Sequence, residues 1–578
     1  MSSLCDSPAP VSETQPAGGV LAQRDWLPMA WSAARTAWRF LRSRRGQVTL
    51  AWVLALVLIA IQAEQVGLHM LRRYDTFHAD AFDLGNMDQA VWNTLHGHPF
   101  RFTNRAEDWY GPPTRLGIHV EPIILLIAPL YLIHSGPQTL ILLQTIALAL
   151  GAIPLFLLAR RRLPELPFVG VAFVASYLLA PELLGSAMWD FHPVALATPL
   201  LMTAIWALDA RRYRWFIVTA LLAAFTKEDV ALALIPLGLY VAYGQRKRLL
   251  GLSTVALSLA WIYLCFGVIL PHFNGGSSGG NTYWYRYAWL GRSAKAAAAN
   301  ALTHPWIPVS YILGDAAHRG YLLLLGATGG GFGLFAPALW VCALPEIAVN
   351  VLSSHAEQYS GFFQYNAVSL PFLMAASVYG VGAWYRRRLR REQGIDALPR
   401  PDAPPPTKSR RTAVLARARW LSRYVYHLWD TGLHHIPISS RFIGSTVIIW
   451  LLFTANLSLA TADSRFTAFW HTGDIPASSQ AQMDALLAEV PANASVAASD
   501  SVDPHLSDRY TLFLMPDPLS YQAEYVAVDV QSATEYHQEA DDYMFNAMLG
   551  SGHYEVVGTA GGIILLRRTG PPLDASQL

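Results

Sequence analysis

Charged residues and cysteines are both scarce in this chain of 578 residues. Only 14% of the residues are Asp, Glu, Lys or Arg, against about a quarter in soluble domains, and 53% are hydrophobic. This composition excludes an ordinary soluble domain and predicts a membrane protein. Cys5 lies in the N-terminal tail, and Cys265 and Cys342 lie inside hydrophobic runs. So few cysteines exclude a secreted disulfide framework and predict packing roles.

Several familiar motifs are also missing. The sequence contains no Walker loop, no HExxH, no GxSxG and no paired CxxC motif. Nucleotide hydrolysis and zinc chemistry therefore have no support, and we expect no nucleic-acid partner. The first hydrophobic run, Thr49 to Leu68, is too long for a signal-peptide core and lacks a small-residue cleavage site after it. We expect it to be retained as the first transmembrane helix.

Charge is segregated along the chain, although the net charge is only +2. Residues 386–423 contain 12 Lys or Arg and 3 Asp or Glu, whereas residues 463–578 contain 4 Arg and 16 Asp or Glu. We expect these two regions on opposite sides of the membrane. Arg42, Arg44 and Arg45 precede the first run, so the positive-inside rule places the N-terminus in the cytoplasm.

Hydrophobic runs with their flanking basic clusters predict about 11 transmembrane helices. The expected spans are 49–68, 138–159, 166–181, 193–209, 214–227, 230–244, 249–271, 308–328, 334–350, 365–385 and 442–461. The segment His119 to His134 is apolar but short, contains two prolines, and would invert every later loop if it crossed. We expect it to lie against the outer face as a juxtamembrane or re-entrant helix.

These spans divide the chain into five parts. They are a cytoplasmic tail (1–48), a polytopic membrane domain (49–385) with an acidic first outer loop (69–137), a basic, Pro-rich cytoplasmic insert (386–441), a last transmembrane helix (442–461) and an extracytoplasmic domain (462–578). In the last part, helical stretches at 478–489 and 532–549 alternate with short apolar strands, which predicts a small soluble α/β domain. The fold class is thus mainly α, polytopic, in the cytoplasmic (inner) membrane. The insert is either a topology anchor or a contact for anionic membrane lipids.

Polar residues at span ends gather on the expected outer side, whereas the inner ends carry mostly Arg and Lys. Ionisable groups at membrane depth mark functional sites by default, although any one of them can be an ordinary residue at headgroup level. The outer set comprises Asp80, Asp83, Asp88, His119, Glu121, Asp190, His192, Lys227, Glu228, Asp229, Glu346, Asn350, His355 and Gln358.

An acidic stretch, Tyr74 to Phe100, follows the first span directly and contains Asp75, Asp80, Asp83 and Asp88. Asp80 and Asp83 are three residues apart, so on a helix their carboxylates share one face. Such a pair can bind Mg²⁺ or Mn²⁺, or divide into a base and an electrostatic partner. The structural alternative is that acids favour the first turn of a helix. Asp88 and Gln89 follow one to two turns later.

Two further motifs carry candidate residues. In WDFHP, His192 stands before Pro193, where a helix should begin, and can serve as general base, metal ligand or phosphate contact, or be purely structural. In TKEDV, three charges separate two apolar segments with almost no loop. Lys227 suits a phosphate, and Glu228 or Asp229 can neutralise it.

Five motifs occur in order: FDLGNMDQAVWNTLHGHPF, HVEPIILLIAPLYL, WDFHPVALATPL, TKEDVAL and ALPEIAVNVLSS. Between about Tyr74 and Tyr379 they resemble the bacterial membrane family called domain of unknown function 2079. More remotely, the arrangement is similar to the glycosyltransferase C superfamily, of the protein mannosyltransferase and aminoarabinose transferase kind. Those enzymes have an acidic residue in the first outer loop, a juxtamembrane helix containing proline, and often a soluble C-terminal domain.

The resemblance implies an inverting glycosyltransferase that moves a sugar from a polyprenyl-phosphate donor to an extracytoplasmic lipid, glycan or protein. It points to Asp83 as catalytic, because Asp83 stands 14 residues before Gly97 as the superfamily's acidic motif stands before its glycine, with Asp80 the near alternative. The acidic motif here lacks the Asp-Glu or Asp-x-Asp form that is usual in the superfamily. Gln364-Tyr365 stands where the superfamily would have a His-Tyr pair. The expected substrate-binding or phosphate-binding residues are His192, Lys227, Glu228, Asp229, His119, Glu121, Asp190, Asp88 and Gln89.

Two other functions are compatible with the same residues. An ion-coupled transporter or flippase could use the outer acids and Lys227. Charges near the middle of the membrane, in two matching halves of the chain, would indicate a transporter, but the charges here cluster at one surface. A non-catalytic envelope scaffold could act through residues 463–578. An outward cleft that joins Asp83, His192 and Lys227 would favour the enzyme.

Overall fold

Long apolar helices and one small sheet make up the chain. The computed structural model describes residues 26–105, 111–274, 282–394, 420, 424, 427, 438–462, 464–466, 475–530 and 538–573. Over these residues the fold is mainly α with a five-stranded C-terminal sheet, which confirms the mainly α fold and the small C-terminal α/β part expected from the sequence. Most of the insert expected at 386–441 lies outside the described residues.

The chain forms two units, Met1–Leu54 and Ala55–Leu578. The first contains α1 (Trp26–Arg42) and the beginning of α2 (Arg44–Asp75). The tail expected at 1–48 thus contains a helix. The first span begins at Arg44, before the hydrophobic run, because the Ser43 hydroxyl caps the helix by accepting from the Gly46 N–H (3.1 Å).

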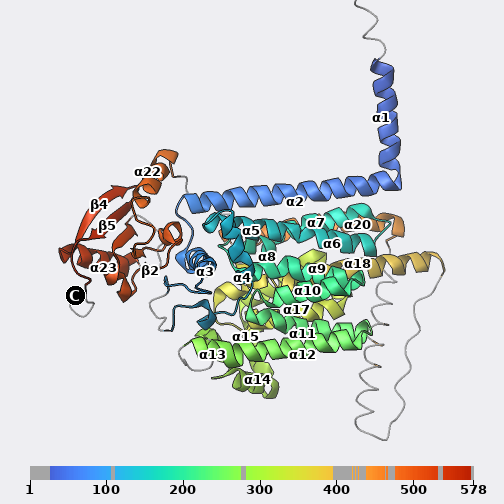
Figure 1. The fold of residues 1–578 in the computed structure, drawn as a ribbon. Helices are drawn as coiled ribbons and strands as arrows, with labels where there is room; N and C mark the ends of the chain where they lie inside the picture. Colours follow the sequence, from blue (N-terminus) through green and yellow to red (C-terminus); the bar gives the residue numbers. More distant parts are fainter. Residues whose placement is uncertain are drawn as a thin grey trace, which may run out of the picture. The chain divides into compact units, whose positions relative to one another are not determined.

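Helices account for most of the second unit (Figure 1). They are α3 (Asn86–Leu95), α4 (Ile124–Ile127), α5 (Pro137–Leu150), α6 (Ala152–Arg162), α7 (Pro167–Leu178), α8 (Pro181–Ala187), α9 (Ala197–Asp209), α10 (Tyr213–Ala224), α11 (Ala231–Leu239), α12 (Arg248–Leu264), α13 (Leu270–Phe273), α14 (Ala294–Thr303), α15 (Trp306–Gly314), α16 (Ala316–Ala327), α17 (Pro337–Val351), α18 (Ser369–Glu392), α20 (Ser440–Ala460), α22 (Ala477–Leu487) and α23 (Gln538–Gly550). The helices α9 and α10, α11 and α12, and α17 and α18 pack in pairs.

Four stretches of helix are long and apolar enough to cross a membrane, where 11 were expected. Among the described residues they are Arg44–Asp75, Pro137–Arg162, Arg248–Phe273 and Ser440–Ala460. A fifth is available if α7 and α8, which are bent by 52°, count as one span. The number falls short because several expected spans are shorter or broken helices.

The expected spans at 308–328 and 365–385 show why the number falls short. The first breaks at Asp315, whose carboxylate caps α16 by accepting from the His318 N–H (3.0 Å). The second is α18, which begins at Ser369 and continues to Glu392, into the expected insert. A charged cap or a late start leaves too few consecutive apolar residues for one span.

The segment expected to lie against the outer face contains only short helices. It holds α4 and a 3₁₀ turn, Ala128–Leu132, in which Pro129 occupies the first turn. Ile123 donates its N–H to Phe225 O (3.0 Å), at the end of α10. The segment is therefore not among the stretches long enough to cross a membrane.

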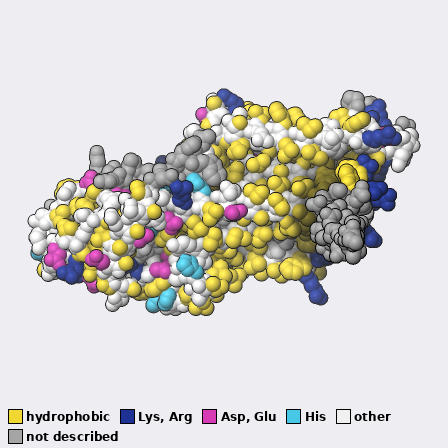
Figure 2. Space-filling view, turned by 90° about the horizontal axis from the view of Figure 1, so that it is seen from above, with side chains coloured by type: hydrophobic (Ala, Val, Ile, Leu, Met, Phe, Trp, Pro, Cys, Tyr) yellow, Lys and Arg dark blue, Asp and Glu magenta, His cyan; other side chains and the backbone are white. Residues whose placement is uncertain are grey.

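Surface chemistry separates the helical part from the sheet. Figure 2 shows hydrophobic side chains in a broad band over the helices, whereas Asp and Glu appear mainly over the C-terminal sheet. Exposed large side chains on α2 include Leu56, Val57, Ile61 and Leu68. A wide exposed apolar band of this kind is the surface that lipid covers.

The C-terminal sheet has the order β2-β1-β3-β5-β4. Its strands are β1 (Val496–Ala498), β2 (Leu512–Leu514), β3 (Tyr525–Asp529), β4 (Tyr554–Ala560) and β5 (Ile563–Arg568). The first three are parallel, β5 is antiparallel to β3, and the edge strand β4 is antiparallel to β5. The strand-like runs of the sequence fall on these strands because each is short, apolar and bounded by turn residues.

The first outer loop is built into this C-terminal sheet. Phe77, from the loop, belongs to the hydrophobic core that β1, β3 and α22 form. His505 stacks on Phe77, with ring centroids 3.8 Å apart, and contacts Tyr74 O through Nε2 (3.0 Å). Thr103 Oγ1 accepts from the Leu512 N–H (2.9 Å) and donates to Leu512 O (2.7 Å), which pairs the loop with β2.

The loop and the sheet approach most closely at Gly85, the last residue of a π-helical turn, η1 (Ala81–Gly85). A Cβ atom at Gly85 would lie 2.0 Å from Asp503 Oδ1, an atom that also accepts from Asn104 Nδ2 (2.8 Å). Asp503 is fully buried and cannot easily move away. Glycine is thus required at this contact.

We predict that Gly85→Ala separates the loop from the C-terminal domain. The added methyl group should lower the free energy of unfolding by about 1 to 3 kcal/mol, measured as a fall in thermal midpoint and faster proteolysis of the C-terminal domain. Gly550→Ala is the matched control, because a Cβ there meets no atom within 4 Å. Equal effects of the two substitutions would contradict this contact.

Candidate functional site

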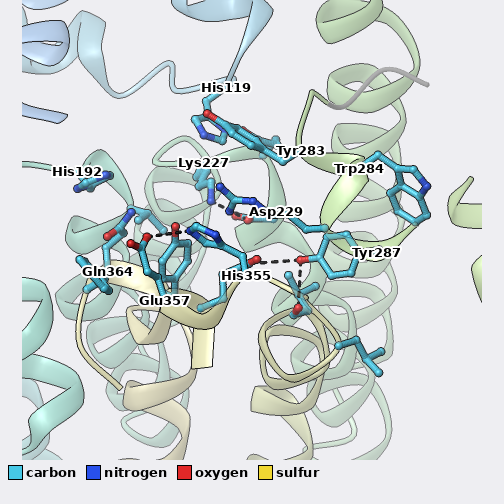
Figure 3. A pocket seen from close by; sticks show the side chains of 18 of the residues that line it. His119, His192, Lys227, Asp229, Tyr283, Trp284, Tyr287, His355, Glu357 and Gln364 are labelled. Carbon is cyan, nitrogen blue, oxygen red and sulfur yellow. Dashed lines mark hydrogen bonds and ion pairs between the residues drawn. The ribbon is translucent and has the colours of Figure 1, made fainter. Parts of the chain in front are cut away.

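A cavity of about 1170 Å³ lies where the acidic loop at 69–137, expected from the sequence as the first outer loop, meets the ends of several helices. Its polar lining includes Arg73, Asp80, Asp83, Arg115, His119, Glu121, His192, Lys227, Glu228, Asp229, Arg286, His355, Glu357, Gln364 and Asp500. These residues come from α2, the first outer loop, the breaks before α9 and α11, the segment before α14, the turns after α17, and the C-terminal domain. The cavity therefore joins residues from distant parts of the chain (Figure 3).

Asp83 forms an ion pair with His192. Asp83 Oδ1 lies 3.0 Å from His192 Nε2, and Asp83 Oδ2 accepts from Trp189 Nε1 (2.7 Å). Burial alone would raise the pKa of Asp83, but the charge and hydrogen bonds of its partners bring that pKa below its usual value. Burial lowers the pKa of His192, but Asp83 outweighs this effect and raises it overall. Because His192 Nδ1 faces Asp190 O (3.0 Å), both ring nitrogens face acceptors, as in a charged imidazolium.

The local backbone places His192 at this position. His192 is extended, with φ −130° and ψ 128°, and Pro193 begins the next 3₁₀ turn, Pro193–Leu196. A residue before proline avoids the helical region, so the break between α8 and α9 is built into the sequence. Gln144 holds the break by donating to Trp189 O (2.9 Å) and accepting from the His192 N–H (2.9 Å).

Asp80 lies among other acids around the buried guanidinium of Arg73. Arg73 contacts Asp190 directly and lies 3.6 Å from Asp80 Oδ2. Asp190 Oδ2 also accepts from the Asp80 N–H (2.6 Å). Burial raises the pKa of Asp80 well above its usual value, since Arg73 offsets only part of the effect of burial and the surrounding acids.

Asp500 brings a carboxylate from the C-terminal domain into the same cavity. It follows β1, and its Oδ1 accepts from the Ala81 N–H (2.8 Å), at the start of η1. Burial raises the pKa of Asp500 to about 6, although the bond from Ala81 opposes the shift. The carboxyl ends of parallel strands are where α/β sheets usually bind ligands. Here the turn η1, which contains Asp83, lies at the carboxyl end of β1.

Lys227, Glu228 and Asp229 occupy the short break between α10 and α11. Lys227 Nζ lies 3.1 Å from Asp229 Oδ2. Glu228 Oε1 lies 2.9 Å from His119 Nδ1, and Glu228 Oε2 accepts from the Val120 N–H (2.9 Å). Burial would raise the pKa of Glu228, but His119 and Lys227 bring it down to about 2. Figure 3 shows Lys227 and Asp229 between His119 above and the His355–Glu357 pair below.

Glu121 is paired inside the first outer loop. Arg115 donates to Glu121 Oε2 from Nη2 (3.0 Å) and to Asn86 Oδ1 from Nη1 (3.2 Å). Both Arg115 and Glu121 are buried and line the cavity. A buried charge of this kind needs its partner, so the pair connects α3 to the segment that precedes α4.

Arg286 differs from the other buried cations of the cavity. Its side chain lies over the ring of Tyr283, 4.4 Å from the centroid, and its Nε donates to Tyr285 Oη (3.5 Å). It also interacts with the hydroxyl group of Tyr365. Among the described residues, no carboxylate lies within ion-pair distance of this guanidinium. The positive charge of Arg286 is therefore not neutralised by a carboxylate of these residues.

Aromatic side chains form another part of the wall. Phe363 has a left-handed backbone, with φ +57°, and packs edge-on against Trp189, with centroids 4.8 Å apart. Arg465 lies over the Phe363 ring, 4.5 Å from the centroid. Gly185 permits this arrangement, because a Cβ there would lie 2.7 Å from the backbone of Phe362. Strained backbone of this kind often marks a functional site.

Eight of the eleven residues that the sequence predicted to be catalytic or to bind substrate line the cavity. They are Asp80, Asp83, His119, Glu121, His192, Lys227, Glu228 and Asp229. The prediction that Asp80 and Asp83 share a helix face is wrong. Asp80 is extended and precedes η1, whereas Asp83 lies within it. The two carboxylates therefore face different partners.

Three other expected residues lie outside the lining. Asp190 supports Arg73 and the backbone of Asp80 from behind. Asp88 is fully buried and accepts from Tyr131 and from Ser507 Oγ (2.6 Å). Gln89 accepts from the Thr103 N–H (2.6 Å) and donates to Arg509 O (3.1 Å). Asp88 and Gln89 thus hold the C-terminal domain to the loop, a role that needed knowledge of tertiary structure.

The possible metal site at Asp80 and Asp83 receives no geometric support. Among the described residues, no group of three or more His, Cys, Asp and Glu is arranged to hold a metal ion. The Asp83 oxygens are directed to His192 and Trp189, and Asp80 faces Arg73. A role for Mg²⁺ or Mn²⁺ stays a prediction from the sequence.

Sequence reasoning missed several residues of the cavity, among them Arg73, Arg286 and Asp500. Arg73 carried a signal, because an arginine at the outer end of a span runs against the positive-inside rule. Arg286 stood out as the single charge within the aromatic run TYWYRYAW. Asp500 had no comparable signal, since only the fold brings the end of β1 to the loop.

We predict that His192→Gln destabilises the protein near neutral pH, because it leaves Asp83 buried without its cation. Since the folded pKa of His192 lies above the ordinary 6.5, the contribution is fully present below pH 6.5 and is lost as the pH rises through the raised pKa. The free energy of unfolding should fall by about 1 to 3 kcal/mol at pH 6, and the difference from the unsubstituted protein should shrink at alkaline pH.

Thermal unfolding in detergent between pH 6 and pH 9 measures this effect. His355→Gln is the matched control, because the His355–Glu357 pair (2.8 Å) is more exposed and should contribute less. A difference between His192→Gln and the unsubstituted protein that is independent of pH would argue against the ion pair.

A family described as "Predicted membrane protein (DUF2079)" matches residues 73–395, more than half of the chain.

Two crystal structures of ArnT from Cupriavidus metallidurans are similar in fold. The one bound to undecaprenyl phosphate has 14% identity and a TM-score of 0.47, covering 90% of this chain and 98% of that one. The apo state has 13% identity and a TM-score of 0.44, covering 90% and 97%. No curated protein matches. The chain belongs to the DUF2079 family of predicted membrane proteins.

Proposed function

We propose that this membrane protein is an inverting glycosyltransferase. It would move a sugar from a polyprenyl-phosphate donor to an extracytoplasmic lipid, glycan or protein. The observation that carries the proposal is one cavity lined both by carboxylates, Asp80, Asp83 and Asp500, and by the cations Lys227 and Arg286. Transfer from a sugar phosphate needs these two kinds of group together, one for the acceptor and one for the leaving phosphate.

The cavity wall also suits a lipid-linked sugar. Tyr283, Trp284 and Tyr287 offer aromatic rings against which a sugar ring can pack. The apolar part of the lining includes Ile262, Phe266, Leu290, Ala294, Ala297, Ala298, Ala301, Val349 and Leu352. Such a surface can hold the first prenyl units while the phosphate stays near the cations.

In the proposed mechanism, Asp83 accepts the proton of the acceptor hydroxyl. The acceptor oxygen forms the new bond to the anomeric carbon, the bond from that carbon to the phosphate oxygen breaks, and its electron pair leaves with the phosphate. The low pKa of Asp83 keeps it ionised. A weak base suffices because glycosyl transfer passes through an oxocarbenium-like state, in which the leaving bond breaks early. Asp80 is the alternative proton acceptor.

Lys227 and Arg286 would neutralise the phosphate as it departs. Asp229 holds Lys227 at 3.1 Å, and the Tyr283 ring supports Arg286. Arg286 has an advantage here, because a guanidinium can donate two parallel hydrogen bonds to a phosphate. His192 contributes positive charge through Asp83 and orients that carboxylate. Any effect of Mg²⁺ or Mn²⁺ would add to these groups.

The proposal places the cavity outside the cytoplasmic membrane of a bacterium. The basic residues before α2 and after α18 would face the cytoplasm, and the acidic C-terminal domain would face the opposite side. The shorter apolar helices Pro193–Asp209, Tyr213–Ala224 and Pro337–Val351 would complete the membrane domain beside the longer spans.

We predict that Asp83→Asn and Asp80→Asn abolish or strongly reduce transfer, by about 10²- to 10⁴-fold for the proton acceptor. The measurement is mass spectrometry of lipid-linked sugars and envelope glycans from a deletion strain that carries each variant. Asp75→Asn is the matched control, because Asp75 belongs to the same acidic stretch but does not line the cavity. Unchanged glycans with both folded variants, in a strain whose deletion alters them, would refute the assignment.

We also predict that Arg286→Gln weakens the use of the lipid-phosphate donor by roughly 10- to 10³-fold, because the leaving phosphate loses its cation. The donor should accumulate in lipid extracts while the membrane level of the protein stays constant. Lys295→Gln provides the control, since Lys295 is exposed on α14 and does not line the cavity. Equal donor levels in the two variant strains would exclude Arg286 from phosphate binding.

A further inference from the structure

The helix α1 separates its charged and apolar residues onto two faces. Trp31, Trp38 and Leu41 are spaced by seven and three residues and share one face, whereas Arg35, Arg39 and Arg42 share the other. The large side chains are exposed, Trp31 by 65% and Trp38 by 57%. Arg42 lies over the Trp38 ring, 4.7 Å from its centroid, at the border between the faces.

A defined bend joins α1 to the first turns of α2. The Ser43 hydroxyl donates to Phe40 O (2.6 Å) and accepts from the Gly46 N–H (3.1 Å). A Cβ at Gly46 would lie 1.9 Å from Phe40 O, so the close approach requires glycine. The bend is thus formed by specific contacts at the junction, where α1 stops and the membrane-crossing helix begins.

Charge complementarity identifies what covers the apolar face. The sequence of α1 contains no acidic residue, and Arg44 and Arg45 continue its positive charge at the start of α2. The helix also adjoins a segment long and apolar enough to cross the bilayer. Exposed tryptophans on one face and arginines on the other are typical of helices that lie in a membrane interface. Anionic headgroups supply the matching charge.

We propose that α1 is an interfacial helix that binds anionic lipid headgroups on the membrane face where α2 begins. Trp31, Trp38 and Leu41 insert at the level of the upper acyl chains, and Arg35, Arg39 and Arg42 contact the headgroup phosphates. The inference does not depend on the catalytic proposal. It assigns a lipid-binding surface to a segment expected from the sequence to be a tail.

The test uses the full-length protein with Cys5→Ser, reconstituted in vesicles of phosphatidylcholine alone or mixed equally with phosphatidylglycerol. A fluorophore is attached at Leu41→Cys, on the apolar face, or at Ser32→Cys, on the polar face. Cys265 and Cys342 are buried and should label little. In the mixed vesicles, nitroxide lipids should quench the Leu41→Cys label several-fold more than the Ser32→Cys label, and aqueous iodide should do the reverse.

The combined variant Arg35→Gln, Arg39→Gln and Arg42→Gln tests the headgroup contact. Each arginine removed should lower the ratio of bound to free helix roughly fivefold in vesicles with phosphatidylglycerol, with little change in phosphatidylcholine. Equal access of iodide to both labels in the mixed vesicles would overturn the proposal. So would energy transfer between labelled copies that depends on protein density and not on lipid composition, because α1 would then bind a second chain.

Discussion

The surroundings of the cavity are organised around one buried cation, Arg73. A guanidinium removed from water is costly unless acids surround it, and Arg73 meets this requirement with Asp190 and Asp80. Asp190 also accepts from the backbone of Asp80, so the end of α2, the start of the loop and the break before α9 meet at one point. The position of Asp83 beside His192 follows from this arrangement, because η1 begins directly after Asp80.

The C-terminal domain acts on the same loop from the other side. Asp500 holds the first N–H of η1, and Asp503 packs against its last residue, Gly85. The short turn η1, which contains Asp83, is therefore held at both ends by residues of the segment that follows β1. A site residue held by partners on two domains keeps its geometry without a long helix, and a regular helix could not have directed Asp80 and Asp83 to different partners.

Composition and charge patterns were sufficient to predict a mainly α membrane protein with a small C-terminal sheet, and several of the polar residues that line the cavity. Counting basic clusters predicted that His119, His192 and Lys227 lie on the same side of the membrane, and these residues do line one cavity. The resemblance pointed to Asp83 as the catalytic acid, but the sequence could not show that Asp88 lies outside the cavity. Only tertiary packing shows that Asp88 is covered by Ser507 and Tyr131. The spans were overcounted because hydropathy does not register a cap such as Asp315, which divides an apolar run into two helices.

The contact between Ala81 and Asp500 joins residues that are 419 positions apart in the chain. At a synthesis rate of 5 to 20 residues per second, the first outer loop emerges roughly 20 to 80 seconds before its partner strand. During that interval Phe77 has no hydrophobic core to enter, and Asp88 has no hydroxyl donor from Ser507. A segment that is made late thus completes a loop that is made early. A chain that stops before residue 500 lacks the carboxylate that holds the Ala81 N–H and cannot form the complete cavity.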